Sequence, residues 1–288
     1  MQANAIHFRK MNGLGNDFVV LDARPRALAL GPDAVRAIAD RDKGIGCDQL
    51  IALEPSEHAD VFMRIWNADG GEVGACGNAA RCVAAIVAEE RGGDKVSIET
   101  ASGVLGSTVN GDGSVTIDMG SPRFAWNDIP LAEPFHDTRR IELQIGPIDD
   151  PVLYSPAVVN VGNPHCLFFV DDIEAHDLAR FGPMLEHHPL FPERANISLV
   201  QVLAPDAIKV RTWERGAGLT RACGTAACAA AVVAARRELT GRKVKVSLPG
   251  GDLLIEWRER DGHVLMTGPY GLDYEGSLPK ELFAADGV

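Results

Sequence analysis

Two cysteines occur in nearly the same local sequence at two distant places in the chain. Cys76 lies in ACGNAA and Cys223 in ACGTAA, and each directly precedes an alanine-rich run that predicts a helix. The first backbone N–H groups of a helix have no partner within the helix and carry partial positive charge. We expect them to lower the pKa of a thiol there toward neutrality and to bind a carboxylate.

The two cysteines belong to an internal repeat. When each residue is laid over the one 147 positions later, 64–90 falls on 211–237 with ten of 27 residues identical, including Cys76 on Cys223. The same offset lays Gly15-Asn16 over Gly162-Asn163. Two segments about sixty residues apart that keep one offset indicate two homologous halves.

Two equivalent thiols suit a reaction that inverts a stereocentre. If the helix starts face each other across a cleft, a thiolate removes a proton from one face of a carbon. A thiol then delivers a proton to the opposite face. Helix N–H groups on a substrate carboxylate would stabilise the charge that develops. A lone buried cysteine before such a helix is usually a packing residue, but a symmetric pair favours catalysis.

The repeat predicts the architecture that positions these thiols. We expect a mixed α/β (α+β) fold of two pseudo-symmetric homologous domains, each a curved mixed sheet around a central helix, with the active site in the cleft between them. The expected central helices are 77–91 and 224–239, and a smaller helix is expected at 32–41 after Pro32. The predicted domains are residues 1–120 plus about 270–288, and residues 121–269. Within the second, residues 121–151 are Pro-rich and predict a crossover with some strand content.

Composition narrows the class of protein. The chain has 288 residues, of which 46% are hydrophobic, and a net charge of −12, which argues against nucleic acid or an anionic membrane as partner. No apolar run reaches the ~20 residues that span a bilayer, and the start of the chain lacks a secretory signal, so we expect a cytoplasmic protein. Six cysteines are too few for a disulfide scaffold. We interpret four of them as structural: Cys47, Cys82, Cys166 and Cys228.

Common cofactor and metal motifs are missing from the sequence. It has no complete GxGxxG, no GxxxxGK[ST], no HExxH and no CxxC. We therefore predict no metal and no cofactor, and no sequence feature favours pyridoxal phosphate.

Six segments together resemble the successive signatures of the diaminopimelate epimerase family: MNGLGNDFVVLD, DRDKGIGCDQL, MRIWNADGGEVGACGNAARC, GNPHCLF, ERANISLVQV and WERGAGLTRACGTAACA. The resemblance covers nearly the whole chain. It implies cofactor-independent interconversion of LL- and meso-2,6-diaminopimelate in lysine biosynthesis. It also implies two pseudo-symmetric α/β domains and a homodimer.

The resemblance assigns roles to individual residues. It implies that Cys76 and Cys223 are the acid/base thiols and that His165 and Glu214 tune their pKa values. The implied pocket residues are Asn16, Gln49, Asn67, Asn163, Asn196, Glu214 and Arg215, and the implied helix-start amides are Gly77, Asn78, Gly224 and Thr225. Asn and Gln both donate and accept hydrogen bonds, and Arg215 can bind a carboxylate in bidentate fashion.

The sequence departs from the family pattern at a few positions. Ala79 and Ala226 stand where the family usually has glycine, at equivalent places in the two halves. Alanine is the better helix former by ~1 kcal/mol, so both helices are still expected. Asn12 and Cys47 stand where the family commonly has His and Phe.

Two other functions fit a pair of thiols. One is a proline or hydroxyproline racemase of the same superfold, although GLGNDF, GNPH and ERGAG favour the diaminopimelate branch. The other is a redox sensor in which the two thiols form a disulfide. Activity that survives in reductant and fails on oxidation would separate catalysis from such a switch.

Overall fold

The computed structural model describes residues 6–278 and divides the chain into two units. Unit 1 is Met1–Ile117 with Gly268–Val288, and unit 2 is Asp118–Thr267. Residues 279–288, which the sequence assigned to the N-terminal half, lie outside the described part, as do residues 1–5. Within the described part, no helix is both long and apolar enough to cross a membrane.

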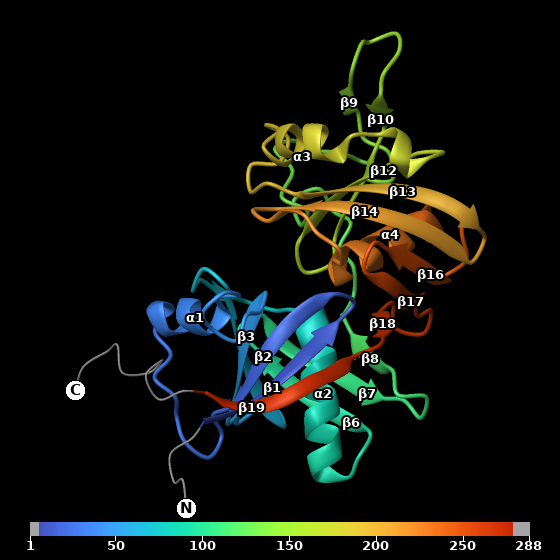
Figure 1. The fold of residues 1–288 in the computed structure, drawn as a ribbon. Coiled ribbons are helices and arrows are strands. Elements are labelled where there is room, and N and C mark those ends of the chain that lie inside the picture. The colour runs from blue at the N-terminus through green and yellow to red at the C-terminus, as the bar shows by residue number, and fades with distance from the viewer. Residues whose placement is uncertain (1–5, 279–288) are drawn as a thin grey trace, which may run out of the picture. The chain divides into compact units, whose positions relative to one another are not determined.

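Unit 1 is a mixed sheet with a central helix (Figure 1). Its elements are β1 (Ile6–Gly13), β2 (Asn16–Asp22), α1 (Pro32–Ala39), β3 (Gln49–Glu54), β4 (Val61–Asn67), β5 (Glu72–Val73), α2 (Gly77–Arg91), β6 (Lys95–Thr100), β7 (Gly103–Val109), β8 (Val115–Asp118) and β19 (Gly271–Leu278). Strand β1 pairs with β19 and with β2, both antiparallel. The order continues through parallel β3, antiparallel β4, parallel β6 and antiparallel β7.

Unit 2 repeats this plan. Its elements are β9 (Gln144–Ile145), β10 (Leu153–Tyr154), β11 (Ala157–Asn160), β12 (Pro164–Phe169), η1 (Ile173–Ala175), α3 (Leu178–Glu186), β13 (Asn196–Ala204), β14 (Ala207–Glu214), β15 (Gly218–Leu219), α4 (Gly224–Arg236), β16 (Lys243–Leu248), β17 (Gly251–Trp257) and β18 (Val264–Gly268). Strands β11, β12, β13, β14, β16 and β17 pair in that order, with the same alternation of antiparallel and parallel neighbours as β1, β2, β3, β4, β6 and β7. The mixed α/β prediction is confirmed.

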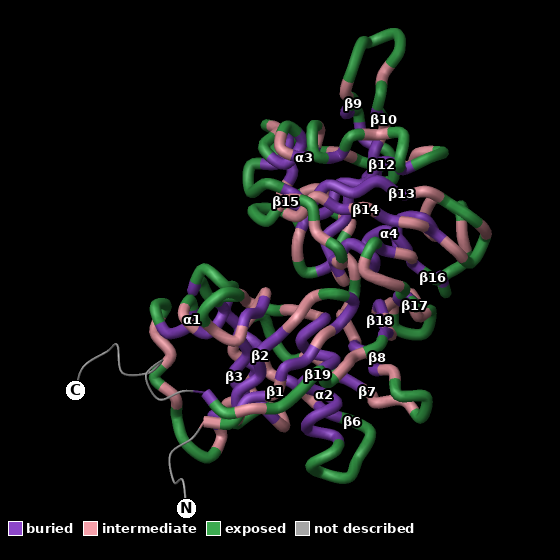
Figure 2. Tube along the Cα trace, in the orientation of Figure 1, coloured by how far each residue is buried: buried purple, intermediate pink, exposed green. Residues whose placement is uncertain are grey.

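The two alanine-rich helices form the centres of the two units. Helix α2 is buried from Asn78 to Ala88 and contacts β1, β4, β6 and β7. Helix α4 is buried from Ala226 to Ala234, and these buried stretches of the two helices are purple in Figure 2. Alanine side chains are short, so the strands of a curved sheet approach such a helix closely. The prediction of 77–91 is confirmed, and α4 ends three residues before the predicted position 239.

Residues related by the 147-residue offset occupy equivalent positions in the two units. Gly77 and Gly224 begin the two central helices, and Gln49 and Asn196 begin strands β3 and β13. Each unit therefore gathers a helix start and several strand ends at one edge of its sheet.

The segment 121–151 is largely irregular and belongs to unit 2. Its strand content is the two-residue strand β9, paired with β10. Ile129, Leu131 and Ile141 are buried in the same hydrophobic cluster as Phe168. Residues 129–143 of the Pro-rich crossover therefore contribute to the core of unit 2, whereas residues 146–150 are exposed.

Candidate active site

Each central helix begins directly after a cysteine. Cys76 is the N-cap of α2 and Cys223 the N-cap of α4, both with extended backbone conformations. Their carbonyl oxygens accept the first helical hydrogen bonds, from Ala80 N at 2.9 Å and Ala227 N at 3.1 Å. The first turn of either helix carries no acidic side chain. The positive ends of both helices thus remain available to an anionic ligand.

Cys223 differs from its sequence-based expectation. The thiol is buried, with 6% of the residue exposed. Burial raises the pKa of Cys223 well above its ordinary value, and the negative charge of Glu214 raises it further. Thr225, whose Oγ1 lies 3.5 Å from the sulfur, and the Ala226 amide oppose this shift without reversing it. The expected lowering of the pKa by the helix is therefore wrong for Cys223, because desolvation dominates.

Glu214 ends strand β14 beside this thiol. Burial raises the pKa of its carboxyl group, while hydrogen bonds from the Thr220 hydroxyl and from Cys223 lower it. The Glu214 carboxyl group and the Cys223 thiol therefore affect each other's pKa. His165 makes a different contact, with Asn163.

The amide residues of unit 1 form two pairs. Gln49 and Asn67 lie opposite each other in the β3–β4 register, and Gln49 Nε2 donates to Asn67 Oδ1 at 3.0 Å. Gln49 Oε1 is buried and has no hydrogen-bond partner among the described residues. Asn78 Nδ2 lies 3.5 Å from Asn16 Oδ1.

The polar residues of unit 2 surround the starts of β12 and β13. Asn163 Oδ1 lies 2.7 Å from His165 Nε2. Asn196 is buried: its Nδ2 donates to the Pro164 carbonyl at 3.0 Å, and its Oδ1 accepts from Arg215 N at 3.0 Å. The exposed guanidinium of Arg215 is near enough to His165 to affect its pKa.

Three positioning residues were missed in the sequence. Glu186 accepts hydrogen bonds from Trp213 Nε1 at 2.7 Å and from Gly216 N at 2.9 Å, and so holds the loop that carries Glu214. Asp48 accepts a hydrogen bond from the Asn16 side chain, and Arg81 donates one to the Asn78 side chain. The partners of Asp48 and Glu186 are distant in sequence, and Arg81, although it bonds Asn78 one turn away, is held by the distant Pro269 carbonyl. Sequence alone does not reveal these contacts.

The remaining singled-out residues are in the core. Ala79 and Ala226 are fully buried, so their methyl groups fill space that a glycine would leave empty. Burial raises the pKa of Cys47 to about 11 and that of Cys82 to about 12, which keeps both as thiols at neutral pH. Cys166 and Cys228 are also buried. In the part of the chain that the structure describes, no cluster of three or more His, Cys, Asp or Glu side chains is arranged to hold a metal ion.

The fold occurs in other solved structures. A phenazine biosynthesis protein of the PhzF family from Bacillus anthracis superposes with a TM-score of 0.66 over 96% of this chain and 99% of that chain, at 17% identity. A hydroxyproline epimerase from Agrobacterium vitis gives 0.66 over 96% and 93%, at 14% identity. The chain therefore has the fold class that these proteins share.

Comparison of sequences identifies the family. The model described as diaminopimelate epimerase matches residues 8–125 and 157–272. The diaminopimelate epimerase of Methylobacterium sp. (strain 4-46) is 57% identical over 284 residues, 96% of each chain. That of Rhodospirillum centenum is 57% identical over 277 residues, 96% of this chain and 93% of the relative. The chain belongs to the diaminopimelate epimerase family.

Proposed function

We propose that this protein is a cofactor-independent isomerase that interconverts LL- and meso-2,6-diaminopimelate, with Cys76 and Cys223 as its two acid/base groups. Family membership supports the substrate and the place in lysine biosynthesis. The observation that carries the mechanism is that each of two homologous helices begins at a cysteine. Such a start supplies both a proton-transfer group and N–H donors for a carboxylate.

The reaction moves two protons. A thiolate takes the proton from the α-carbon, and the thiol of the other cysteine gives its proton to the opposite face of the same carbon. The S–H bond formed at one residue balances the S–H bond broken at the other, so the stereocentre inverts without a redox change. In the reverse direction the two residues exchange roles. The helix N–H groups stabilise the negative charge that develops on the substrate carboxylate.

Glu214 couples substrate binding to the ionisation of Cys223. Without substrate, burial and the Glu214 charge raise the pKa of Cys223, so this residue holds its proton at neutral pH. A substrate ammonium group bound to Glu214 would neutralise that carboxylate and lower the pKa of the thiol. The thiolate would then form mainly when substrate is present.

Polar side chains of both units fit the remaining substrate groups. Gln49 in unit 1 has a buried oxygen free to accept a hydrogen bond from an ammonium group. Arg215 in unit 2 supplies a guanidinium group suited to a carboxylate. Asn67 and Asn196 fix the neighbouring amide and backbone groups.

We infer that the protein works in the cytoplasm as a homodimer. A mechanism with two reduced cysteines requires a reducing compartment. Strand β19 carries two exposed apolar side chains, Leu272 and Tyr274, on either side of a β-bulge. The family resemblance implies a homodimer, and we infer that the exposed part of β19 around Leu272 contacts the second copy.

A substrate panel tests the proposed function. The purified protein is incubated under reductant, without added cofactor, with LL-diaminopimelate, L-proline or trans-4-hydroxy-L-proline, and stereoisomers are separated by chiral chromatography. We expect the meso isomer from diaminopimelate and no inversion of the other two. Inversion of proline or hydroxyproline alone would contradict the proposal.

A further inference from the structure

Two homologous asparagines are held in different ways. Asn16 follows Gly15 and Asn163 follows Gly162, both glycines with positive φ (80° and 108°), and the asparagines are related by the 147-residue offset. An amide side chain has two donor hydrogens on one end and an acceptor oxygen on the other. Its partners therefore decide which end it presents to a ligand.

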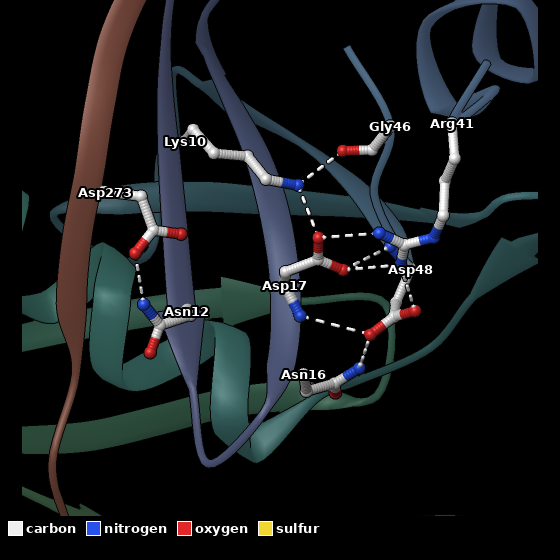
Figure 3. Close-up of polar contacts among 8 residues, drawn as sticks. All are labelled: Lys10, Asn12, Asn16, Asp17, Arg41, Gly46, Asp48 and Asp273. Carbon is white, nitrogen blue, oxygen red and sulfur yellow. Dashed lines mark hydrogen bonds and ion pairs between the residues drawn. The ribbon is translucent and has the colours of Figure 1, made fainter. Parts of the chain in front are cut away.

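Asp48 determines the orientation of Asn16. Asn16 Nδ2 donates to Asp48 Oδ2 at 2.8 Å (Figure 3). A carboxylate can only accept hydrogen bonds, so the NH2 group of Asn16 must face Asp48. The carbonyl oxygen of Asn16 points the other way, toward Asn78 and the start of α2.

Asp48 is itself held by a charged network. Arg41 donates to Asp48 Oδ1 at 2.7 Å, and the backbone N–H of Asp17 donates to Oδ2 at 3.1 Å. Asp17 is bound in turn by Arg41 and by the buried Lys10, which also donates to the Gly46 carbonyl (Figure 3). Although burial alone would raise the pKa of Asp17, hydrogen bonds from Arg41 and Lys10 lower it. Both carboxylate oxygens of Asp48 therefore accept hydrogen bonds, one from the charged Arg41 and one from the Asp17 backbone.

Arg81 determines the orientation of Asn78, the amide that lies next to Asn16. The fully buried Arg81 donates from Nη2 to Asn78 Oδ1 at 3.0 Å. A guanidinium only donates, so the NH2 group of Asn78 faces the carbonyl oxygen of Asn16. The separation of 3.5 Å makes this a weak hydrogen bond, and the Asn16 oxygen keeps a second lone pair for a ligand.

His165 determines the opposite orientation of Asn163. The imidazole is fully buried, and burial lowers its pKa to about 3, so it is neutral and carries one N–H. Nδ1 has no partner among the described residues. A buried donor without an acceptor is costly, which favours the hydrogen on Nε2, 2.7 Å from Asn163 Oδ1. The carbonyl of Asn163 is then occupied, and its NH2 group is presented.

We propose that Asp48 and His165 are positioning residues that give two homologous substrate-binding amides opposite orientations. Asn16 presents its carbonyl oxygen to a substrate ammonium group, and Asn163 presents its NH2 group to a substrate carboxylate. The near-symmetric protein thereby distinguishes the two charged groups of an amino acid. This inference rests on the proposed function.

Side-chain exchange tests the orientation of Asn16. In Asn16→Asp two carboxylates meet, and kcat/KM for diaminopimelate should fall roughly 10- to 100-fold. In the charge-conserving double variant Asn16→Asp/Asp48→Asn, the new amide at position 48 donates to the new carboxylate at position 16. An oxygen is again presented to substrate, so most of the loss should be recovered, mainly through KM. A double variant no better than Asn16→Asp would overturn the assignment.

The same substitution at the homologous position should impair binding for a different reason. Asn163→Asp keeps an acceptor for the His165 N–H but replaces the presented NH2 group by an oxygen. We expect KM to rise roughly 10- to 100-fold, with an unfolding midpoint close to that of the parent. An unchanged KM would overturn the proposal.

Side-chain amide NMR tests orientation without turnover. In the substrate-free protein, Asp48→Asn should shift the NH2 resonances of Asn16, which are assigned by their loss in Asn16→Asp. The control Asp112→Asn removes another hydrogen-bonded carboxylate, from the turn after β7, and should leave them unchanged. Unshifted resonances in Asp48→Asn would overturn the role of Asp48. A parent protein without epimerase activity would contradict the proposed function alone, since the spectra still decide the orientation.

Discussion

At the scale of single residues, environment determines which chemistry a side chain can perform. Cys223 and Cys82 are both buried thiols, and burial raises the pKa of each. Cys223 also contacts the carboxyl group of Glu214, to which we propose that a substrate ammonium group binds. Cys82 donates to the Asn12 carbonyl and lies within α2. This difference predicts that Cys223 takes part in turnover and that Cys82 does not.

Serine substitutions separate the catalytic cysteines from the structural one. Cys76→Ser and Cys223→Ser should each lower kcat by roughly 10²- to 10⁴-fold, because a hydroxyl does not ionise near neutral pH and acid/base groups contribute about this factor. Cys82→Ser should keep most of the activity. Epimerisation rates of the three variants, with unfolding midpoints as controls, give the comparison. Near-parental turnover in either of the first two would exclude the two-thiol mechanism.

The buried His165 predicts an acid-sensitive fold. Burial, with the charge of Arg215 adding to it, lowers its pKa from 6.5 to about 3. Its contribution to the free energy of unfolding is full above pH 6.5 and is lost as the pH falls toward 3, by about 1.4 kcal/mol per pH unit. Urea unfolding of the parent and of His165→Gln across this range should show the steeper decline in the parent. Parallel curves would contradict the assignment.

At the scale of elements, the repeat made the central helices predictable. The alanine-rich runs after equivalent cysteines predicted α2 with its observed bounds and placed the end of α4 three residues too late. The support of the site was not predictable, since Asp48, Arg81 and Glu186 each bond a residue that only the tertiary fold brings near: Asn16, Pro269 and Trp213. Nor does the sequence reveal that burial raises the pKa of Cys223 by more than the helix start lowers it, which is why the expected lowering is wrong.

The alanines that replace the family's usual glycines should stabilise the two helices. Ala79→Gly and Ala226→Gly each remove a fully buried methyl group and increase the backbone entropy of the unfolded chain. We expect each to lower the free energy of unfolding by about 1 kcal/mol. Ala101→Gly, in the turn between β6 and β7, is the control with little expected effect. Unchanged or increased stability in both helix variants would show that these alanines are poorly accommodated.

At the scale of the whole molecule, each unit carries one cysteine at a helix start and its own set of polar side chains. The sequence repeat predicted this equivalence, because residues 147 positions apart begin corresponding elements in the two units. It did not predict that equivalent amides have partners of different character, since Asp48 in unit 1 has Ala195 at the equivalent position in unit 2. In the proposed mechanism, discrimination between the two substrate groups depends on where the two halves differ.

Strand β19 supplies the test of the inferred dimer. Leu272 is 53% exposed and Tyr274 49%, and the ring of Tyr274 packs edge-on against Phe8 at 5.8 Å between centroids. Leu272→Glu should weaken self-association at least tenfold, because a charge would be buried at the contact. Sedimentation velocity of this variant should show monomer, whereas Leu254→Glu, on exposed strand surface of unit 2, should behave as the parent. A persistent dimer in Leu272→Glu would contradict this interface.

The most direct measurement is the position of deuterium in the first turnovers of LL-diaminopimelate in D2O, under reductant and without added cofactor. With two separate thiols, the proton removed from substrate goes to one residue, and the product receives a solvent-derived deuteron from the other. We predict meso product deuterated at the inverted α-carbon, while the remaining LL substrate keeps its α-proton. Meso product that retains the original α-proton, or deuterium entering the LL substrate as fast as product forms, would contradict the two-thiol mechanism.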